Sequence, residues 1–148
     1  MIGCPALSPQ ELKLALANLK GRFALRDRAL VTLGVRTGLR ISELLALKVG
    51  QVWDGRRTVA RFYVARQATK GKHAGASIVL HPDAARAVAR WIKAGKLAAS
   101  PGSYLFPSQK SARLLGRKSA WEILHPAFQR VGVMGHGWHP LPSKDVRQ

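Results

Sequence analysis

The stretch "RTGLRISELLALKVGQV", Arg36–Val52, decides how the rest of the sequence is interpreted. Gly38 is placed to end one helix, because glycine readily adopts the left-handed conformation that closes a helix. A second, short helix is predicted over "ISELLALK" (41–48), with its leucines facing inward. Arg40 lies at the junction, and Glu43, three residues on, shares its face. An arginine so placed can offer its planar fork to a phosphate while the carboxylate holds it in one orientation.

Two further helices are predicted on the N-terminal side of this stretch. The first begins where Ser8 can cap and Glu11 completes a capping box, and it runs to about Leu19. The second covers "ALRDRALVTLGVRT" (24–37), whose leucines and valines recur at near-helical intervals, and it ends at Gly38.

On the C-terminal side the spacing changes to that of strands. "QVW" (51–53), "TVARFYVA" (58–65) and "ASIVL" (76–80) carry β-branched and aromatic residues and predict a small antiparallel sheet. "HPDAARAVARWIKAG" (81–95) predicts a helix with Pro and Asp in its first turn. "SYLFPS" (103–108) follows as a short extended segment.

A last helix is predicted from Ser119, which caps "AWEILHPAFQRVG". Pro126 either kinks this helix or divides it in two. The order is therefore helical, then a small sheet, then helical again. We predict one mostly helical α+β domain over residues 1–148.

Basic residues outnumber acidic ones by a wide margin. The 148 residues include 25 Lys and Arg against 7 Asp and Glu, which gives a net charge of +18. Solubility alone needs a net charge of about 2–8 in a small domain. Such an excess repels itself unless an anionic partner is bound, and nucleic acid is the commonest such partner. We expect double-stranded DNA, bound mainly through its backbone, ahead of a membrane surface.

Other classes of protein are disfavoured by the composition. Cys4 is the single cysteine, so an intramolecular disulfide and a cysteine-cluster zinc site are excluded. No apolar run approaches the roughly 18 residues of a membrane span, and the N-terminus lacks a secretory pattern, so we expect a cytoplasmic protein. His125, His136 and His139 suggest zinc ligands, but no nearby cysteine or carboxylate supports them, and we expect neither a metal nor another cofactor.

The stretch 36–52 resembles the first arginine box of the tyrosine recombinases, or phage-type integrases, which reads approximately TGLRxSELLxLxWxDI. An isolated Arg-x-x-Glu is more often a surface ion pair, but here some sixteen positions agree. "LSPQEL" is similar to the usual opening of that family's catalytic domain, and "ATKGKHAGASIVLHPDAARAVARWI" to its lysine-bearing hairpin and following helix. "YLFPS" resembles its "LF" element. The resemblance runs from about Ala6 to about Val133.

The resemblance implies a role for several residues. Arg40 matches the first catalytic arginine, which contacts the scissile phosphate and stabilises its developing charge. Lys70 matches the hairpin lysine, the general acid toward the leaving 5′ oxygen, and Lys72 replaces it if the hairpin register shifts by two. Glu43 matches the acidic position behind the arginine. The residues expected to contact DNA are Arg36, Arg40, Lys70, Lys72 and Lys118.

The chain departs from the family pattern in its last part. The family requires a second box, HxLR, and later a tyrosine that attacks phosphorus. Tyr63 and Tyr104 are the only tyrosines, and neither occupies the position of that nucleophile. We expect both to be core or edge aromatics. The resemblance therefore implies an integrase-type catalytic domain without its C-terminal helices, and a chain that does not exchange DNA strands.

Residues 134–148 diverge from the family, and a shift in reading frame would explain this. Regrouping the codons from the second base of Trp138 permits Gly-Thr-His-Ser-Leu-Arg-Lys-Thr-Phe-Ala, which contains the second box. The Pro140 codon must be CCA to supply the histidine, and the Ser143 codon must supply a G for the arginine. We infer a truncated, frameshifted domain encoded by a prokaryotic mobile element, acting in the cytoplasm or on the nucleoid.

Two classes of function remain open on the sequence. The chain is either an inert form of a DNA breaking-rejoining catalytic domain, or a non-catalytic nucleic-acid-binding module that uses the same basic cleft. The loss of C-terminal helices also exposes apolar surface, through which the chain could form a homo-oligomer.

Overall fold

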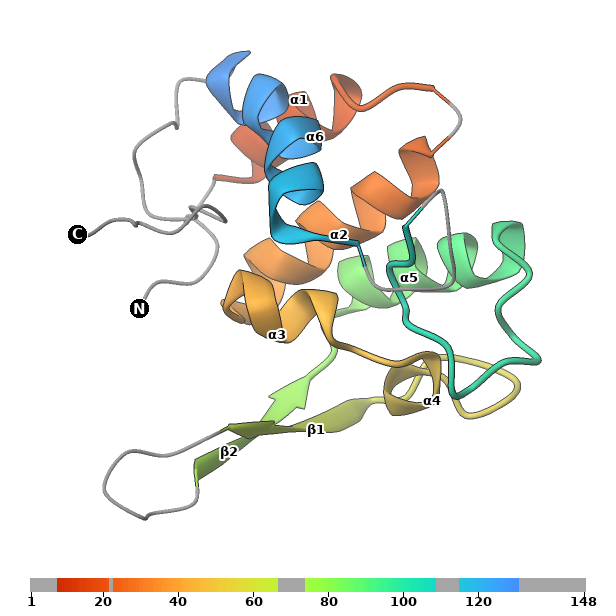
Figure 1. Ribbon diagram of the computed structural model, residues 1–148. Coiled ribbons are helices and arrows are strands. Elements are labelled where there is room, and N and C mark those ends of the chain that lie inside the picture. The colour runs from red at the N-terminus through yellow and green to blue at the C-terminus, as the bar shows by residue number, and fades with distance from the viewer. Residues whose placement is uncertain (1–7, 22, 67–73, 109–114, 131–148) are drawn as a thin grey trace.

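The computed structural model describes residues 8–21, 23–66, 74–108 and 115–130, and these residues form a helical body with one hairpin beneath it (Figure 1). The elements are α1 (Pro9–Ala17), α2 (Ala24–Thr37), α3 (Ile41–Leu45), α4 (Val49–Val52), β1 (Arg61–Arg66), β2 (Ala74–Val79), α5 (Pro82–Ala94) and α6 (Arg117–Arg130). The predicted α+β class is confirmed. No helix within these residues is both long enough and apolar enough to cross a lipid bilayer.

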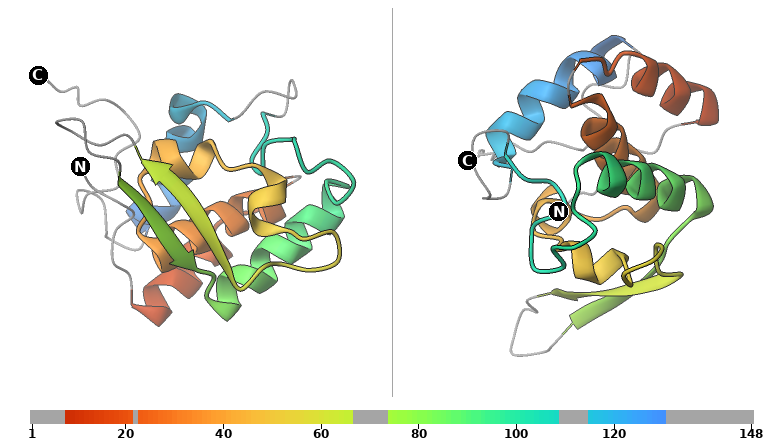
Figure 2. Two further views of the ribbon diagram at one scale, coloured as in Figure 1. Left: turned by 90° about the horizontal axis from the view of Figure 1, so that it is seen from below. Right: turned by 90° about the vertical axis from the view of Figure 1, so that its right-hand side faces the viewer.

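Helix α2 forms the centre of the body. Its residues Leu30 and Leu33 are fully buried, and it packs along α5, in which Val88 and Ile92 are also fully buried. Helices α1, α3 and α6 each contact α2 as well. The further views show the helices gathered on one side of the hairpin (Figure 2). The core therefore lies between helices, and the hairpin covers one side of it.

The ends of α1 and α2 follow the sequence signals. Ser8 Oγ accepts from the amide of Glu11 at 3.1 Å, and a Glu11 carboxylate oxygen accepts from the amide of Ser8 at 2.9 Å. The predicted capping box is thus confirmed. Helix α1 ends at Ala17, two residues earlier than predicted, and Leu19 packs into the core beyond its end. Helix α2 ends before Gly38, as predicted.

The sheet has two strands rather than three within the described residues. β1 and β2 pair antiparallel, from Arg61 opposite Val79 to Arg66 opposite Ala74. Residues 51–53 do not form the predicted strand: α4 includes residues 51 and 52, and Trp53 makes an isolated bridge to Thr58. The strand predicted over these residues is therefore wrong: the amides of Val49 and Gly50 donate to the carbonyls of Ser103 and Pro101, and the Gln51 side chain accepts the amide of residue 48 at 2.8 Å within the helical turn.

The predicted extended segment over 103–108 connects the region of the short helices α3 and α4 to α5 through hydrogen bonds. The amide of Leu105 donates to the carbonyl of Leu47 at 2.8 Å, and the amide of Val49 donates to the carbonyl of Ser103 at 2.9 Å. Leu105 and Phe106 are fully buried. The segment therefore holds α3 and α4 against the body.

Helix α6 begins earlier than the sequence predicts. It starts at Arg117, and its first bond runs from the amide of Ala120 to the carbonyl of Gly116 at 2.9 Å. Ser119 consequently lies inside the first turn, and its predicted capping role is wrong. The helix continues through Pro126 to Arg130, so the proline does not divide it.

Candidate nucleic-acid interface

Arg40 is held at a tight junction between two helices. Gly38 takes a left-handed backbone conformation, with φ of 69°, and its amide donates to the carbonyl of Gly34 at 2.9 Å. Leu39 is fully buried. Arg40 is the N-cap of α3, with extended backbone, and its side chain is exposed. Burial of the preceding leucine therefore fixes where the arginine emerges from the surface.

Glu43 contacts Arg40 in a different way from the one expected. A Glu43 carboxylate oxygen accepts the backbone amide of Arg40 at 2.9 Å, because the first amides of a helix need acceptors. Within the described residues, no hydrogen bond or ion pair involves the Arg40 guanidinium. Its five N–H donors are therefore available to an anionic ligand.

A groove of about 320 Å³ runs beside Glu43, between α3, α4 and β1. Val64 and Ala65 line it on the strand side, and Ser42 on the helix side. The amide nitrogen of the Gln51 side chain donates to the carbonyl of Tyr63 at 3.2 Å, which ties α4 to β1. The helix that carries Arg40 is thereby placed against the base of the hairpin.

Of the three lysines expected to contact DNA, the structure describes Lys118 but not Lys70 or Lys72. β1 ends at Arg66 and β2 begins at Ala74, so Lys70 and Lys72 belong to the connection between them and lie outside the described residues. Lys118 is exposed in the first turn of α6. The hairpin expected from the sequence is confirmed, while the positions of its two lysines remain predictions.

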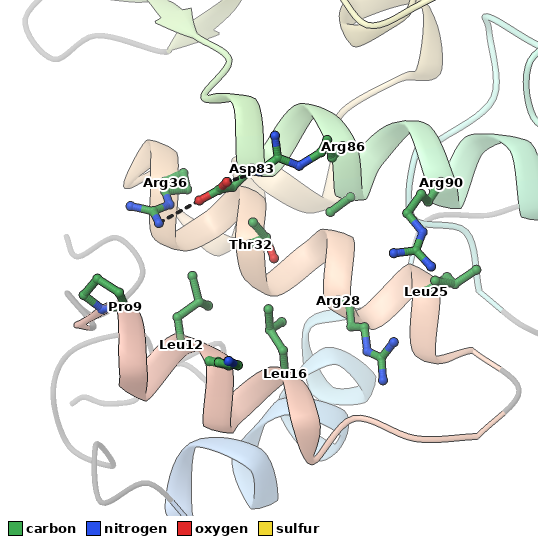
Figure 3. Close-up of a pocket in the computed structure, with 12 residues that line it drawn as sticks. Pro9, Leu12, Leu16, Leu25, Arg28, Thr32, Arg36, Asp83, Arg86 and Arg90 are labelled. Atoms are coloured by element: carbon green, nitrogen blue, oxygen red, sulfur yellow. Dashed lines mark hydrogen bonds and ion pairs between the residues drawn. The ribbon is translucent and has the colours of Figure 1, made fainter.

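Arg36 is paired with an acidic residue that the sequence did not point to. Its guanidinium donates to Asp83 of α5 at 3.0 Å, and Arg86 donates to the same carboxylate (Figure 3). Arg36 and Asp83 are 47 positions apart, so no local pattern could have paired them. The spacing of Asp83, Arg86 and Arg90 along one face of α5 was visible in the sequence and was not used.

The two tyrosines have structural surroundings. Tyr63 lies on β1 with 61% of its surface exposed, and its ring lies over Gly75 of the neighbouring strand, at the space a Cβ would fill. Tyr104 makes an isolated bridge to Lys48, whose ammonium is 4.5 Å from the tyrosine ring centroid. Tyr63 is thus an edge residue, and Tyr104 is half-buried beneath a cation.

No group of three potential metal ligands occurs within the described residues. The ring of His125 packs on Trp121, with ring centroids 4.2 Å apart. His136 and His139 lie outside the described residues.

Several carboxylates already have partners, which leaves much of the basic surface uncompensated. Burial raises the pKa of Asp27, and this rise is partly offset by the Arg26 guanidinium, which donates to it at 3.0 Å. The pKa of Asp54 is lowered by hydrogen bonds from the amides of Arg57 and Arg56. Asp83 receives two arginines.

The Phage integrase family model matches residues 5–144. The chain belongs to the phage integrase family. This match rests on sequence and covers nearly the whole chain, including the arginine junction, the hairpin and α6. No curated protein sequence matches the chain closely enough to serve as a relative.

Solved structures of recombinases share the fold of this phage integrase family member. The XerA recombinase structure matches with a TM-score of 0.64 and 18% identity, over 91% of this chain and 45% of that one. The XerH site-specific recombinase bound to its difH substrate, in a pre-cleavage complex, matches with a TM-score of 0.62 and 18% identity, over 92% and 40% of the two chains. The chain therefore spans less than half the length of the structures it matches.

Proposed function

We propose that this phage integrase family member binds double-stranded DNA with the surface formed by the start of α3, the β1–β2 hairpin and the start of α6. The observation that carries the proposal is the exposed guanidinium of Arg40, which has no acceptor among the described residues and extends from a backbone position fixed by the buried Leu39. An unpaired arginine at a defined position is suited to donate two parallel hydrogen bonds to a phosphate. XerH, which shares the fold, was solved with its DNA substrate bound.

In this proposal, Arg40 donates hydrogen bonds to the non-bridging oxygens of one DNA phosphate. Negative charge develops on these oxygens during phosphoryl transfer, so the arginine stabilises the transition state more than the ground state. Glu43 positions the arginine by holding its backbone amide. In the complete active site of the family, where a tyrosine attacks phosphorus and the bond to the 5′ oxygen breaks, the position of Lys70, or of Lys72 in the alternative register, protonates that leaving oxygen. Lys118 adds positive charge along the DNA backbone.

The chain on its own is proposed not to cut DNA. Cutting requires a nucleophile, and the two tyrosines are accounted for by the edge of β1 and by the bridge to Lys48. A histidine and a second arginine from an HxLR box are also needed to complete the charge neutralisation. The chain then acts as a DNA-binding part of a recombination active site.

Binding is tested by fluorescence anisotropy with a labelled duplex at several salt concentrations. We expect the logarithm of the association constant to fall linearly with the logarithm of salt concentration. Arg40→Ala should make that slope shallower by about 1, because one phosphate contact is lost. Arg90→Ala, which removes an exposed arginine from α5, is the matched control and should change the slope less. A chain that shows no salt-dependent association would overturn the proposal.

The absence of cutting is tested separately with a nicked suicide substrate. Such a substrate traps the covalent link if a tyrosine attacks phosphorus. We expect no protein–DNA adduct on a denaturing gel. An adduct that disappears in Tyr63→Phe or Tyr104→Phe would identify the nucleophile and contradict the inactive assignment.

A further inference from the structure

A second concave surface lies between α1 and α5, with α2 as its floor, and we name it the α1–α5 groove (Figure 3). Its volume is about 390 Å³. The α1 wall is mainly aliphatic, formed by Pro9, Leu12 and Leu16, which follow the spacing of one helix face. Leu25 of α2 extends this apolar surface at one end.

The opposite wall of the α1–α5 groove is rich in arginine. Arg86 and Arg90 come from α5, and Arg28 and Arg36 come from α2. Figure 3 shows Arg36 at one end of the groove and Arg90 at the other. Lys13 of α1 also lines the groove, so five cationic side chains meet one carboxylate, Asp83.

The one carboxylate does not neutralise this wall. Asp83 accepts from Arg36 and Arg86, at the end of the groove away from Arg90. Arg28 donates to the carbonyl of Leu19 at 3.3 Å, and that neutral group leaves its charge uncompensated. Within the described residues, no acidic side chain pairs with Arg90. The end of the groove near Arg28 and Arg90 therefore presents positive charge beside an aliphatic wall.

We propose that the α1–α5 groove binds an acidic amphipathic helix of a partner protein. The leucines of such a helix would pack on Pro9, Leu16 and Leu25, which line the groove and keep accessible surface, and its carboxylates would pair with Arg28 and Arg90. Recognition of this kind combines an apolar stripe with charged contacts along a groove between helices. The wall residues on α1 span seven positions, or about 10 Å, which corresponds to two turns of a bound helix.

The composition of the groove disfavours other occupants. A second copy of this chain carries +18 and only 7 acidic residues, so it lacks a complementary acidic face. A DNA backbone would satisfy the arginines but would leave the accessible aliphatic surface of Pro9 and Leu16 without an apolar partner. The combined chemistry matches one acidic and one apolar stripe on the same ligand.

The ligand side is tested with synthetic peptides and the full chain. The probe is a labelled helical peptide of about 14 residues, some 21 Å long, with leucines on one face and glutamates on the other. Its Glu→Gln and Leu→Ser forms, and a scrambled peptide of the same composition, are the comparisons. We expect each of the three to bind at least about tenfold more weakly by anisotropy. Equal binding of the scrambled peptide would overturn the proposal, because only charge would then matter.

The protein side is tested with a pair of charge reversals. Arg90→Glu lies in the α1–α5 groove, whereas Arg56→Glu makes the same change of charge at an exposed position between α4 and β1. We expect Arg90→Glu to weaken binding of the glutamate peptide about tenfold and Arg56→Glu to change its affinity much less. Thermal unfolding of both variants checks that the fold is retained, and Arg28→Gln provides a second groove variant if one does not fold.

Duplex DNA separates this proposal from the DNA-binding one. Arg40→Ala should weaken duplex binding and leave the affinity for the peptide unchanged. Arg90→Glu should weaken peptide binding and should reduce duplex binding no more than Arg56→Glu does. If Arg90→Glu weakens DNA more than Arg56→Glu does, and the peptide is unaffected, the groove is a DNA surface and the partner-helix proposal fails. Loss of DNA binding alone, with peptide binding intact, would instead remove only the proposed function.

Discussion

The indole nitrogen of Trp91 donates a hydrogen bond of 2.7 Å to the carbonyl oxygen of Leu105, and both residues are buried. This bond joins α5 to the extended segment, and the amide of Leu105 donates to the carbonyl of Leu47, two residues beyond the end of α3. The backbone of Leu105 therefore links α5, through its carbonyl, to the residues that follow α3, through its amide.

Trp91→Phe should destabilise the domain by about 1–3 kcal/mol, because the ring volume is largely kept while the Leu105 carbonyl loses its donor. Urea unfolding followed by circular dichroism measures the change. Trp53→Phe is the matched control: the Trp53 nitrogen is buried without a partner among the described residues, so its removal leaves no group newly unpaired. An equal cost for the two substitutions would mean that packing, and not the hydrogen bond, accounts for the effect.

Arg26→Leu should cost about 3–5 kcal/mol, because it leaves the buried Asp27 carboxylate without its cation. The Arg26 guanidinium also donates to the carbonyl of Pro107 at 3.3 Å and lies 4.4 Å from the Phe23 ring centroid. The double variant Arg26→Leu/Asp27→Leu should recover part of the loss, since the uncompensated charge is gone. The unfolding free energies of Arg26→Leu, Asp27→Leu and the double variant give the coupling energy between the two side chains. Additive effects of the two substitutions would contradict a stabilising interaction between them.

The pH dependence of stability should contain a contribution from Asp54. Hydrogen bonds from the amides of Arg57 and Arg56 lower the pKa of this carboxyl below its ordinary value of 3.8. A lowered pKa means that the unfolded chain takes up the proton first, so the stabilisation is present above the ordinary value and is lost as the pH falls below it. Asp54→Ala should therefore lower the melting temperature at pH 6, and the gap should narrow toward pH 2. A gap that widens on acidification would refute this assignment.

Gly38→Ala should cost about 1–2 kcal/mol, because the backbone at this position is left-handed while no atom lies within 4 Å of an added Cβ. Strain alone is therefore tested. Gly102→Ala is the control, since its Cβ would also meet open space and its backbone is not left-handed. We further expect Gly38→Ala to weaken duplex binding in the anisotropy assay through displacement of Arg40. Unchanged stability of the Gly38 variant would indicate that the junction adjusts freely.

Much of the fold could be predicted from short-range signals. The capping box at Ser8, the glycine after α2 and the proline-aspartate start of α5 each depend on a few neighbouring residues, and each was confirmed. The hairpin followed from β-branched residues on both sides of a glycine-rich connection. These signals are local because the backbone hydrogen bonds that they satisfy are local.

The error over residues 51–53 arose because distant residues decide the local conformation there. Residues 51–53 have strand-like side chains, but the amides of Val49 and Gly50 are taken by the carbonyls of Ser103 and Pro101, and the chain turns there as α4. Sequence patterns record side-chain preference and contain no record of which remote segment supplies a partner.

The candidate site divides in the same way. Arg40 and Glu43 are three positions apart, and the sequence correctly predicted that they meet, although not that the carboxylate would take the backbone amide. Arg36 was assigned to DNA, and its partner Asp83 comes from a helix far along the chain. The α1–α5 groove was not predicted from the sequence, because it depends on how α1 packs beside α2 and α5.

The junction between α2 and α3 has a mechanical consequence. Three residues, 38–40, join the two helices, and the middle one, Leu39, is fully buried. Because this link is short and its middle residue is buried, a small tilt of α2 also displaces the backbone of Arg40, from which the guanidinium extends. A conservative change in the buried interior, such as Leu33→Val, should therefore weaken the contact between Arg40 and a DNA phosphate, although Leu33 itself touches no DNA.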